Sequence, residues 1–284
     1  GIFGAAASVG SIIAPVLIPM LFLAFGWRVT FAVVGSLGII WVIPWLIINK
    51  KGPKEHPWIT DKEREYIISG QPECRVSCDT AKSWGRLLGE RKNYAVILGR
   101  FFLDPIWWMF VTWLPIYLIE VFGLDIKQIA MSAWVPYVGA AIGSVAGGWF
   151  SGLLINRGKT VNFARKAAMI VGSCFIIPGM ILAAVASSAT MAVIMMAFIL
   201  GGYQFVMTNI QTLASDLQTG KAVGSLAGLG GASAVLGTII SILCIPYLTQ
   251  SGDWTAFFIL GAALVPACLL CVFLFGGRIE QLNK

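Results

Sequence analysis

Charged residues are scarce in this chain of 284 residues. They make up 12% of the sequence, about half the share that is usual in a soluble domain. Hydrophobic residues make up 58%, and they gather in segments that are apolar on every side. The helices of a soluble all-α protein carry only an apolar stripe. The composition therefore argues against a soluble all-α domain and predicts an all-α membrane protein.

Histidine is nearly absent, and the cysteines form no recognisable metal or disulfide pattern. The one histidine, His56, lies in a polar stretch, so the apolar segments lack the nucleophile–base pair or metal ligands of a membrane enzyme. Cys268 and Cys271 form a C-x-x-C inside an apolar segment, where cysteine behaves as a small apolar residue. Cys74 and Cys78 are predicted to lie in a cytoplasmic loop, where thiols stay reduced. We therefore expect no metal, no cofactor and no enzymatic activity.

The sequence also lacks an initiator methionine and a signal-peptide pattern. Gly1 opens directly on an apolar segment, with no charged flank and no cleavage site before it. We expect the chain to begin partway through a larger membrane protein.

Apolar segments of about 20 residues, the length that crosses a bilayer, follow one another along the chain. Eight are predicted, and the longest are expected to tilt or to extend beyond the membrane. They are Gly1–Phe25, Trp27–Asn49, Tyr94–Leu118, Gln128–Leu154, Lys166–Ala186, Met191–Ala214, Val223–Leu248 and Trp254–Phe275.

The net charge of +7 is explained by orientation rather than by a nucleic-acid partner. If residues 50–93 lie in the cytoplasm and the spans alternate, all 20 Lys and Arg residues except Arg28, Lys127 and Arg100 fall on the cytoplasmic side. The positive-inside rule predicts this asymmetry. We therefore expect a multi-pass protein with a cytoplasmic C-terminus and no nucleic-acid partner.

The polar stretch 50–93 contains two short helices in our prediction. Thr60 to Glu63 read as a capping box that opens a helix ending near Gly70. A second, amphipathic piece from Ser83 to Arg91 is expected to lie on the inner membrane surface. It is interpreted as a surface-bound linker, with a regulatory latch as the alternative.

Glycines recur at helical spacing in several segments. Gly139, Gly143 and Gly147 follow one another every four residues, as do Gly224 and Gly228. Small residues at this spacing let helix backbones approach closely. They predict either ordinary bundle packing or helices that move during transport, and the two are compatible.

The third apolar segment carries charges where a bilayer tolerates few. Arg100 and Asp104 are one helical turn apart, and Trp107 and Trp108 follow. Asp104 lies about 15 Å from the start of the span, near the midplane, where charged residues usually face a bundle interior or a water-filled cavity. Two interpretations are open. The pair is an intrahelical ion pair, with Arg100 reaching towards the cytoplasmic end, or it binds substrate and links protonation to gating.

Polar residues also gather in the segment that begins at Met191. Buried amides and hydroxyls need partners, so they either join helices or contact a substrate. Together with the two tryptophans, they form a set suited to a sugar. The residues are Tyr203, Gln204, Thr208, Asn209 and Gln211.

Tyr137 and Trp134 extend the possible aromatic platform from the fourth segment. The alternative for this pair is an aromatic belt at the membrane interface, which suits Trp134 better than Tyr137.

Many short stretches of the chain resemble the anion:cation symporter branch of the major facilitator superfamily, most closely the bacterial hexuronate transporters. The similarity runs nearly end to end and is most specific from Arg100 to Leu118. The stretches are Gly26-Trp27-Arg28, Phe31, His56-Pro57-Trp58, Glu63-Arg64-Glu65-Tyr66, Gly99-Arg100-Phe101-Phe102, Asp104-Pro105, Trp107-Trp108, Trp113-Leu114-Pro115, Tyr117-Leu118, Gly147-Gly148-Trp149, Ser151, Asn209, Leu213, Ser215-Asp216, Val223-Gly224-Ser225 and Ala227-Gly228.

The resemblance implies a twelve-helix fold in two halves of six, of which this chain would hold helices five to twelve. It places two helices of the first half in residues 1–49, a cytoplasmic central loop in 50–93, the second half in 94–275 and a cytoplasmic tail in 276–284. In this family the first four helices carry the main proton-coupling carboxylates and the arginine that grips the substrate carboxylate. Those positions lie outside this sequence.

The function implied is proton symport of a sugar-acid anion, such as glucuronate or galacturonate, across the bacterial inner membrane. The protein is expected to act as a monomer when complete, with the lipid bilayer as its surroundings. Alternatives are uptake of another organic anion (an aldonate, a glucarate-type acid or another carboxylate), proton-independent exchange on the same fold, and a sensor that binds ligand without moving it.

Overall fold

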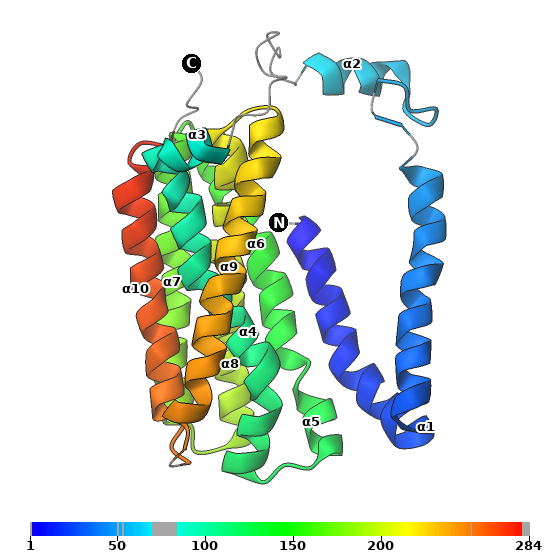
Figure 1. The fold of residues 1–284 in the computed structure, drawn as a ribbon, viewed down its shortest axis with the longest axis vertical. Coiled ribbons are helices and arrows are strands. Elements are labelled where there is room, and N and C mark those ends of the chain that lie inside the picture. The colour runs from blue at the N-terminus through cyan, green and yellow to red at the C-terminus, as the bar shows by residue number, and fades with distance from the viewer. Residues whose placement is uncertain (1, 50, 53, 70–83, 251, 280–284) are drawn as a thin grey trace. The chain divides into compact units, whose positions relative to one another are not determined.

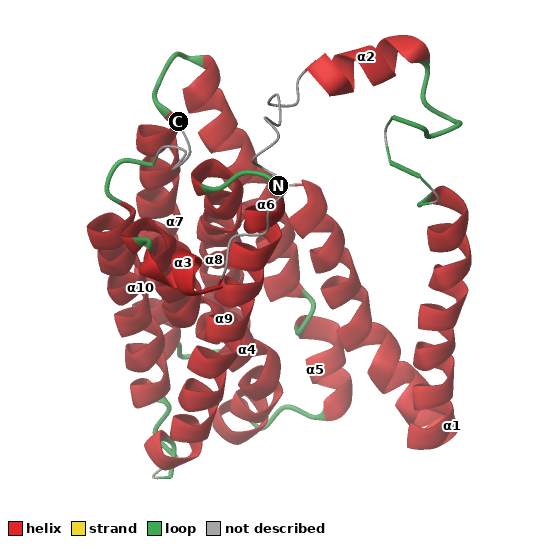
Figure 2. Cartoon of the chain, turned by 45° about the horizontal axis from the view of Figure 1, so that its top comes forward, coloured by secondary structure: helices red, strands yellow, loops and turns green. Residues whose placement is uncertain are grey.

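The computed structural model describes residues 2–49, 51–52, 54–69, 84–250 and 252–279. Over these ranges every regular element is a helix (Figures 1 and 2). The chain divides into two compact units, one formed by Gly1–Val16 with Ala81–Lys284 and the other by Leu17–Thr80.

Seven helices of the described ranges are long and apolar enough to cross a membrane. The first of them, α1, has a break at Gly26, where φ is 75° and ψ is 173°. This combination is open to glycine and costly for other residues. The two sides of this break correspond to the first two predicted segments, so the prediction of eight apolar segments is confirmed. The long helices are α1 (Ile2–Ile48), α4 (Tyr94–Phe122), α6 (Val135–Asn156), α7 (Val161–Ala184), α8 (Ala189–Leu217), α9 (Lys221–Leu248) and α10 (Thr255–Gly276).

The fourth predicted segment differs from the sequence analysis, because it is two helices. A short helix α5 (Ile126–Ser132) ends at a turn over Ala133 and Trp134, and α6 begins at Val135. Pro136 stands in the first turn of α6. Proline has no N–H to donate and its ring crowds the carbonyl of the preceding turn, so it starts a helix rather than continuing one.

Helices α4 to α10 form a bundle with two packed groups. Helix α8 packs against α6 and α7, helix α4 packs against α9 and α10, and α4 and α8 contact each other. The bundle has an α3 end, where α6, α8 and α10 finish, and an α5 end, where they begin (Figure 1). Phe110, Phe257 and Phe258 are fully buried between α4 and α10 and make ring contacts with one another.

Glycines bring α6 and α8 into backbone contact. A Cβ placed on Gly139, Gly143 or Gly147 would overlap the backbone of Ala197, Gly201 or Phe205 on α8. The predicted close approach is therefore confirmed for this glycine series. Gly224 and Gly228 differ, since a Cβ on either would meet no described atom within 4 Å.

The short helices also follow the predictions in part. Helix α2 (Asp61–Ser69) opens with the predicted capping box, in which the Thr60 N–H donates to Glu63 at 3.0 Å. The Thr60 hydroxyl also donates to Glu63, at 2.8 Å. The two hydrogen bonds hold the pKa of Glu63 below its usual value. Helix α3 (Trp84–Gly89) buries Leu87 completely while Trp84 stays exposed. The loop cysteines, Ser83 and the rest of 70–83 lie outside the described residues.

Candidate functional site

Arg100 and Asp104 form an ion pair within α4. Nη2 of Arg100 donates to Oδ2 of Asp104 at 2.9 Å, and the Asp104 residue is only 5% exposed. Helix α8 supplies a second donor, because the Tyr203 hydroxyl donates to Oδ1 of Asp104 at 3.1 Å. Both carboxylate oxygens are therefore hydrogen-bonded, as a buried charge requires. The intrahelical pair considered from the sequence is present, with Tyr203 as a third member.

The Arg100 guanidinium lies against a glycine-lined part of α9. A Cβ on Gly230 would lie 3.2 Å from Cδ of Arg100, and one on Gly231 would lie 3.6 Å from Nη1. The Nε of Arg100 is buried and has no hydrogen-bond partner among the described residues. A guanidinium offers five N–H donors in a fixed fork that suits carboxylates. Arg100 therefore keeps donor capacity beyond its bond to Asp104.

Aromatic rings extend this site from α4 to α6 and α8. The Trp107 ring lies 5.7 Å from the ring of Tyr137, edge to face, and 5.6 Å from that of Tyr203, at an interplanar angle of 30°. Both tyrosines are buried and Trp107 is partly buried. We call Arg100, Asp104, Trp107, Tyr137 and Tyr203 the α4 cluster. Trp108 is not part of this cluster of buried and partly buried residues, since 47% of it is exposed.

The remaining predicted residues of α8 do not share one environment. Thr208 is buried, and its Oγ1 lies 3.3 Å from Oγ of Ser144 on α6. Asn209 is fully buried, and its Nδ2 donates to the carbonyl oxygen of Gly147 at 3.2 Å. Gln211 is exposed and Gln204 is partly exposed. The structure therefore joins Thr208 and Asn209 to the α6–α8 contact, while the two glutamines lie at more open positions.

A second polar network, missed from the sequence, joins three helices near the α3 end. Arg165 of α7 pairs with Asp216 of α8 at 2.8 Å. Its Nη1 also donates to Oγ of Ser151 at 3.1 Å and to Oδ1 of Asn209 at 3.3 Å. We call these four residues the Arg165 network. The available signal was a basic and an acidic residue placed just inside the ends of two apolar helices.

No candidate metal site is found in the ranges that the structure describes: no three His, Cys, Asp or Glu side chains gather there. Cys268 is buried, and its Sγ lies 3.3 Å from the carbonyl oxygen of Gly99. This cysteine therefore takes part in the packing of α4 against α10.

Comparison with known proteins connects this bundle to transporters. Residues 1–229 match the sequence pattern of the Major Facilitator Superfamily. The hexuronate transporter of Escherichia coli K12 is 33% identical over 265 residues, which cover 91% of this chain and 60% of that protein. The galacturonate transporter of Dickeya chrysanthemi is 33% identical over 187 residues, covering 64% of this chain and 53% of that protein. The probable galactarate/D-glucarate transporter of Escherichia coli K12 is 29% identical over 262 residues, covering 80% of this chain and 58% of that protein.

The chain thus spans about 60% of the length of the first of these relatives. Among solved structures, a bacterial homolog of the human lysosomal transporter Spinster, in an inward-facing and unoccupied conformation, superposes with a TM-score of 0.56. Its sequence is 15% identical, and the match covers 95% of this chain and 66% of that one. At this identity the similarity concerns the fold.

Proposed function

Because the chain belongs to the Major Facilitator Superfamily, we propose that the protein is a secondary active transporter that takes up a sugar-acid anion together with a proton. The substrate is a hexuronate such as glucuronate or galacturonate. Transport proceeds by alternating access, in which the two halves of the fold rock around a site near the midplane. The protein lies in the bacterial inner membrane with its C-terminus in the cytoplasm, and it works as a monomer when complete.

The α4 cluster is the observation that carries this proposal. A sugar acid needs a positive group for its carboxylate, hydrogen-bonding groups for its hydroxyls and a flat ring for its apolar face. The Nε of Arg100 has no partner within the described part of the chain, Asp104 and Tyr203 supply oxygens, and Trp107 supplies the ring. Two relatives are named as transporters of hexuronate and of galacturonate, and the similarity to them supports this substrate class.

The charge balance of the Arg100–Asp104 pair supports the proposed coupling to protons. With Asp104 ionised, the guanidinium is neutralised by its own helix. A proton on Asp104 would remove that charge and leave Arg100 free to hold the carboxylate of the substrate. Proton and anion would then enter and leave the site together, since each makes the other easier to accommodate.

Gln204, Thr208, Asn209, Gln211 and Trp108 stay predicted substrate contacts. Gln204 and Gln211 are the more accessible of these residues on α8, so they are the ones a hydroxylated ligand would reach with least rearrangement. Uptake of a glucarate-type acid is the second candidate, and the similarity to a probable galactarate/D-glucarate transporter favours it. Proton-independent exchange is the alternative mechanism.

The test is uptake of radiolabelled glucuronate by cells that express the complete protein. We expect uptake that collapses when a protonophore is added. Unlabelled galacturonate should compete with the label, whereas glucose, which has no carboxylate, should not. Uptake that survives the protonophore would indicate exchange. Absence of uptake by protein shown to be in the membrane would contradict the hexuronate assignment, and labelled glucarate would be tested next.

A further inference from the structure

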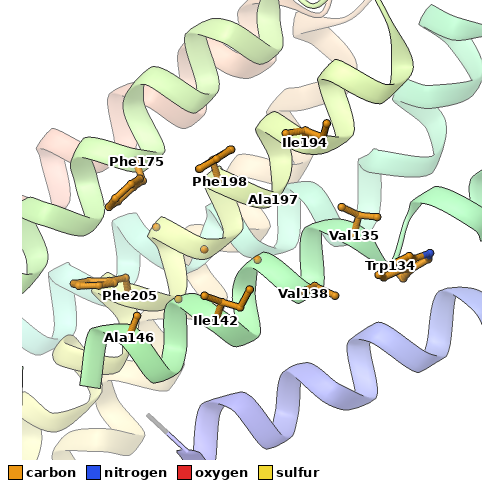
Figure 3. A pocket seen from close by; sticks show the side chains of 14 residues that line it. Trp134, Val135, Val138, Ile142, Ala146, Phe175, Ile194, Ala197, Phe198 and Phe205 are labelled. Carbon is orange, nitrogen blue, oxygen red and sulfur yellow. The ribbon is translucent and has the colours of Figure 1, made fainter. Parts of the chain in front are cut away.

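A long apolar groove lies between α6, α7 and α8, apart from the α4 cluster (Figure 3). Its volume is about 550 Å³, and its lining consists of glycines and apolar side chains, with the indole nitrogen of Trp134 as the one polar side-chain atom. Large side chains along it are exposed, including Ile142 at 64% and Phe198 at 50%. The groove is therefore open to the surroundings of the bundle.

The floor of the groove is made by glycine backbone. Gly139 and Gly143 of α6 and Gly201 and Gly202 of α8 line it. At Gly143 a Cβ would overlap the carbonyl group of Gly201, so the two backbones touch and no side chain rises between them. The hollow is thus a direct result of the sequence of these two helices.

The length of the groove matches one leaflet of a bilayer. On α6 it extends from Trp134 to Ala146 and on α8 from Ile194 to Phe205, which is about 16–18 Å at 1.5 Å per residue. Half of a hydrocarbon core of about 30 Å is about 15 Å.

The two ends of the groove differ as the surface and the centre of a bilayer differ. Trp134 stands at one end, near the α5 end of the bundle, and its Nε1 donates to the carbonyl oxygen of Met131 at 2.8 Å. Tryptophan favours the membrane interface. The rings of Phe175 and Phe205 lie at the other end (Figure 3), halfway along α7 and α8.

We propose that this groove binds one acyl chain of a membrane lipid from the leaflet at the α5 end. The chain enters beside Trp134, and its methyl end rests against Phe175 and Phe205. A water-soluble ligand would need polar groups to fix its orientation, and the floor offers none. The exposed apolar rim lies within membrane-spanning helices, so a lipid chain is the partner whose chemistry and length both fit.

The experiment uses the complete protein in phosphatidylcholine vesicles that contain phosphatidylcholine with a diazirine on the last carbon of one acyl chain. After irradiation, labelled residues are mapped by mass spectrometry. We expect labelling of Phe175 and Phe205 at least about fivefold above that of Leu270, an α10 residue that is 60% exposed. Leu270 reports contact with bulk lipid.

Two variants fill the groove from different sides. Ala146→Phe adds a ring at the inner end, and Ile142→Trp adds bulk at the rim. Each should lower the labelling of Phe175 and Phe205 at least about fivefold and leave Leu270 unchanged. The matched control is Val145→Phe, because Val145 is the neighbour of Ala146, is 46% exposed and does not line the groove. It should change nothing.

Two results would overturn the proposal. In the first, Phe175 and Leu270 are labelled equally, and the variants that fill the groove are folded but leave this labelling unchanged. Only bulk lipid would then contact the groove. Labelling of Leu270 without labelling of Phe175 and Phe205 would mean that protein covers it. Size-exclusion profiles of each variant establish which are folded before irradiation.

Discussion

The Tyr203 hydroxyl of α8 donates a hydrogen bond of 3.1 Å to Oδ1 of Asp104 on α4. Arg100 donates to the other oxygen of the same carboxylate from within α4. The charge of Asp104 is therefore held by two helices at once. Any event that neutralises this carboxylate changes the contact between α4 and α8 as well as the charge in the site.

Tyr203→Phe should weaken that contact without emptying the space that the ring occupies. A hydrogen bond to a charged group is worth about 1.5–3 kcal/mol, which corresponds to a fall in Tm of roughly 3–8 °C for a protein of this size. Tyr117→Phe is the matched control, because its hydroxyl makes a longer bond of 3.4 Å to an uncharged carbonyl oxygen. Thermal unfolding in detergent measures both. Equal Tm values for the two variants would contradict the assigned role of Tyr203.

Asp104→Asn should leave the Arg100 guanidinium without its counter-charge inside a span. Breaking a buried ion pair costs several kcal/mol. Since the Arg100 side chain is 20% exposed, we expect a loss of about 2 kcal/mol together with loss of glucuronate uptake. Adding Arg100→Gln removes the unpaired charge, so the double variant should recover thermal stability while uptake stays absent. A double variant as unstable as Asp104→Asn would show that the ion pair is not what stabilises this region.

Arg165 and Asp216 should prove strongly coupled in a double-mutant cycle. Their side chains are only 15% and 19% exposed, and Arg165 has two further acceptors. We expect a coupling energy of at least about 1 kcal/mol between Arg165→Gln and Asp216→Asn, measured by unfolding. The comparison is the pair Arg64 and Asp61, in which the Asp61 side chain is 97% exposed and that of Arg64 30%. Solvent screening at Asp61 suggests a coupling of about 0.5 kcal/mol or less for this pair. Similar couplings for both pairs would contradict a structural role of the Arg165 network.

Gly143→Ala should destabilise the bundle, whereas Gly228→Ala should not. At Gly143 the new methyl would overlap the backbone of Gly201, while at Gly228 it would meet no described atom within 4 Å. Forced overpacking costs about 1–3 kcal/mol, and alanine in an open helical site gains up to about 1 kcal/mol over glycine. The Tm values of the two variants should therefore move in opposite directions. A rise in Tm for Gly143→Ala would contradict the backbone contact at that site, and a fall for Gly228→Ala would contradict the open space at the other.

Trp107→Ala should lower glucuronate uptake at least about tenfold, because Trp107 is the ring that joins Tyr137 and Tyr203, and aromatic contacts are worth about 0.5–1.5 kcal/mol each beyond burial. Trp108→Ala is the comparison from the same helix turn. Trp108 is 47% exposed, so its loss should lower uptake less than the loss of Trp107 does, by about threefold or less. Initial uptake rates normalised to membrane protein provide the measurement. A larger loss of uptake in Trp108→Ala than in Trp107→Ala would place the site on the other face of α4.

The positions of the helices could be predicted from the sequence, because long apolar segments need no knowledge of their neighbours. Gly26 separated the first two segments as expected, and the capping box at Thr60 was found where helix α2 begins. The break before α6 was missed, since the segment Gln128–Leu154 contains no charged residue that would interrupt it. Pro136 was its only local signal.

Site residues were harder to place, because periodicity gives the face of a helix but not what covers that face. Thr208 and Gln211 belonged to the same predicted polar set, yet Thr208 is buried against Ser144 whereas Gln211 is exposed. The partner of Asp104 on α8 is 99 residues away in sequence, and that of Arg165 is 51 residues away. Such pairs depend on helix order and rotation, which the local sequence does not encode.

The glycine contact between α6 and α8 should make these two helices move together as one rigid unit. Backbone meets backbone at Gly139, Gly143 and Gly147, and atoms this close leave no soft layer of side chains in which one helix could slide along the other. A displacement of α8 at Tyr203 would then displace the whole helix as a rigid body, including Asp216. A displacement of Asp104 at the middle of the bundle would therefore also displace the ion pair at its α3 end.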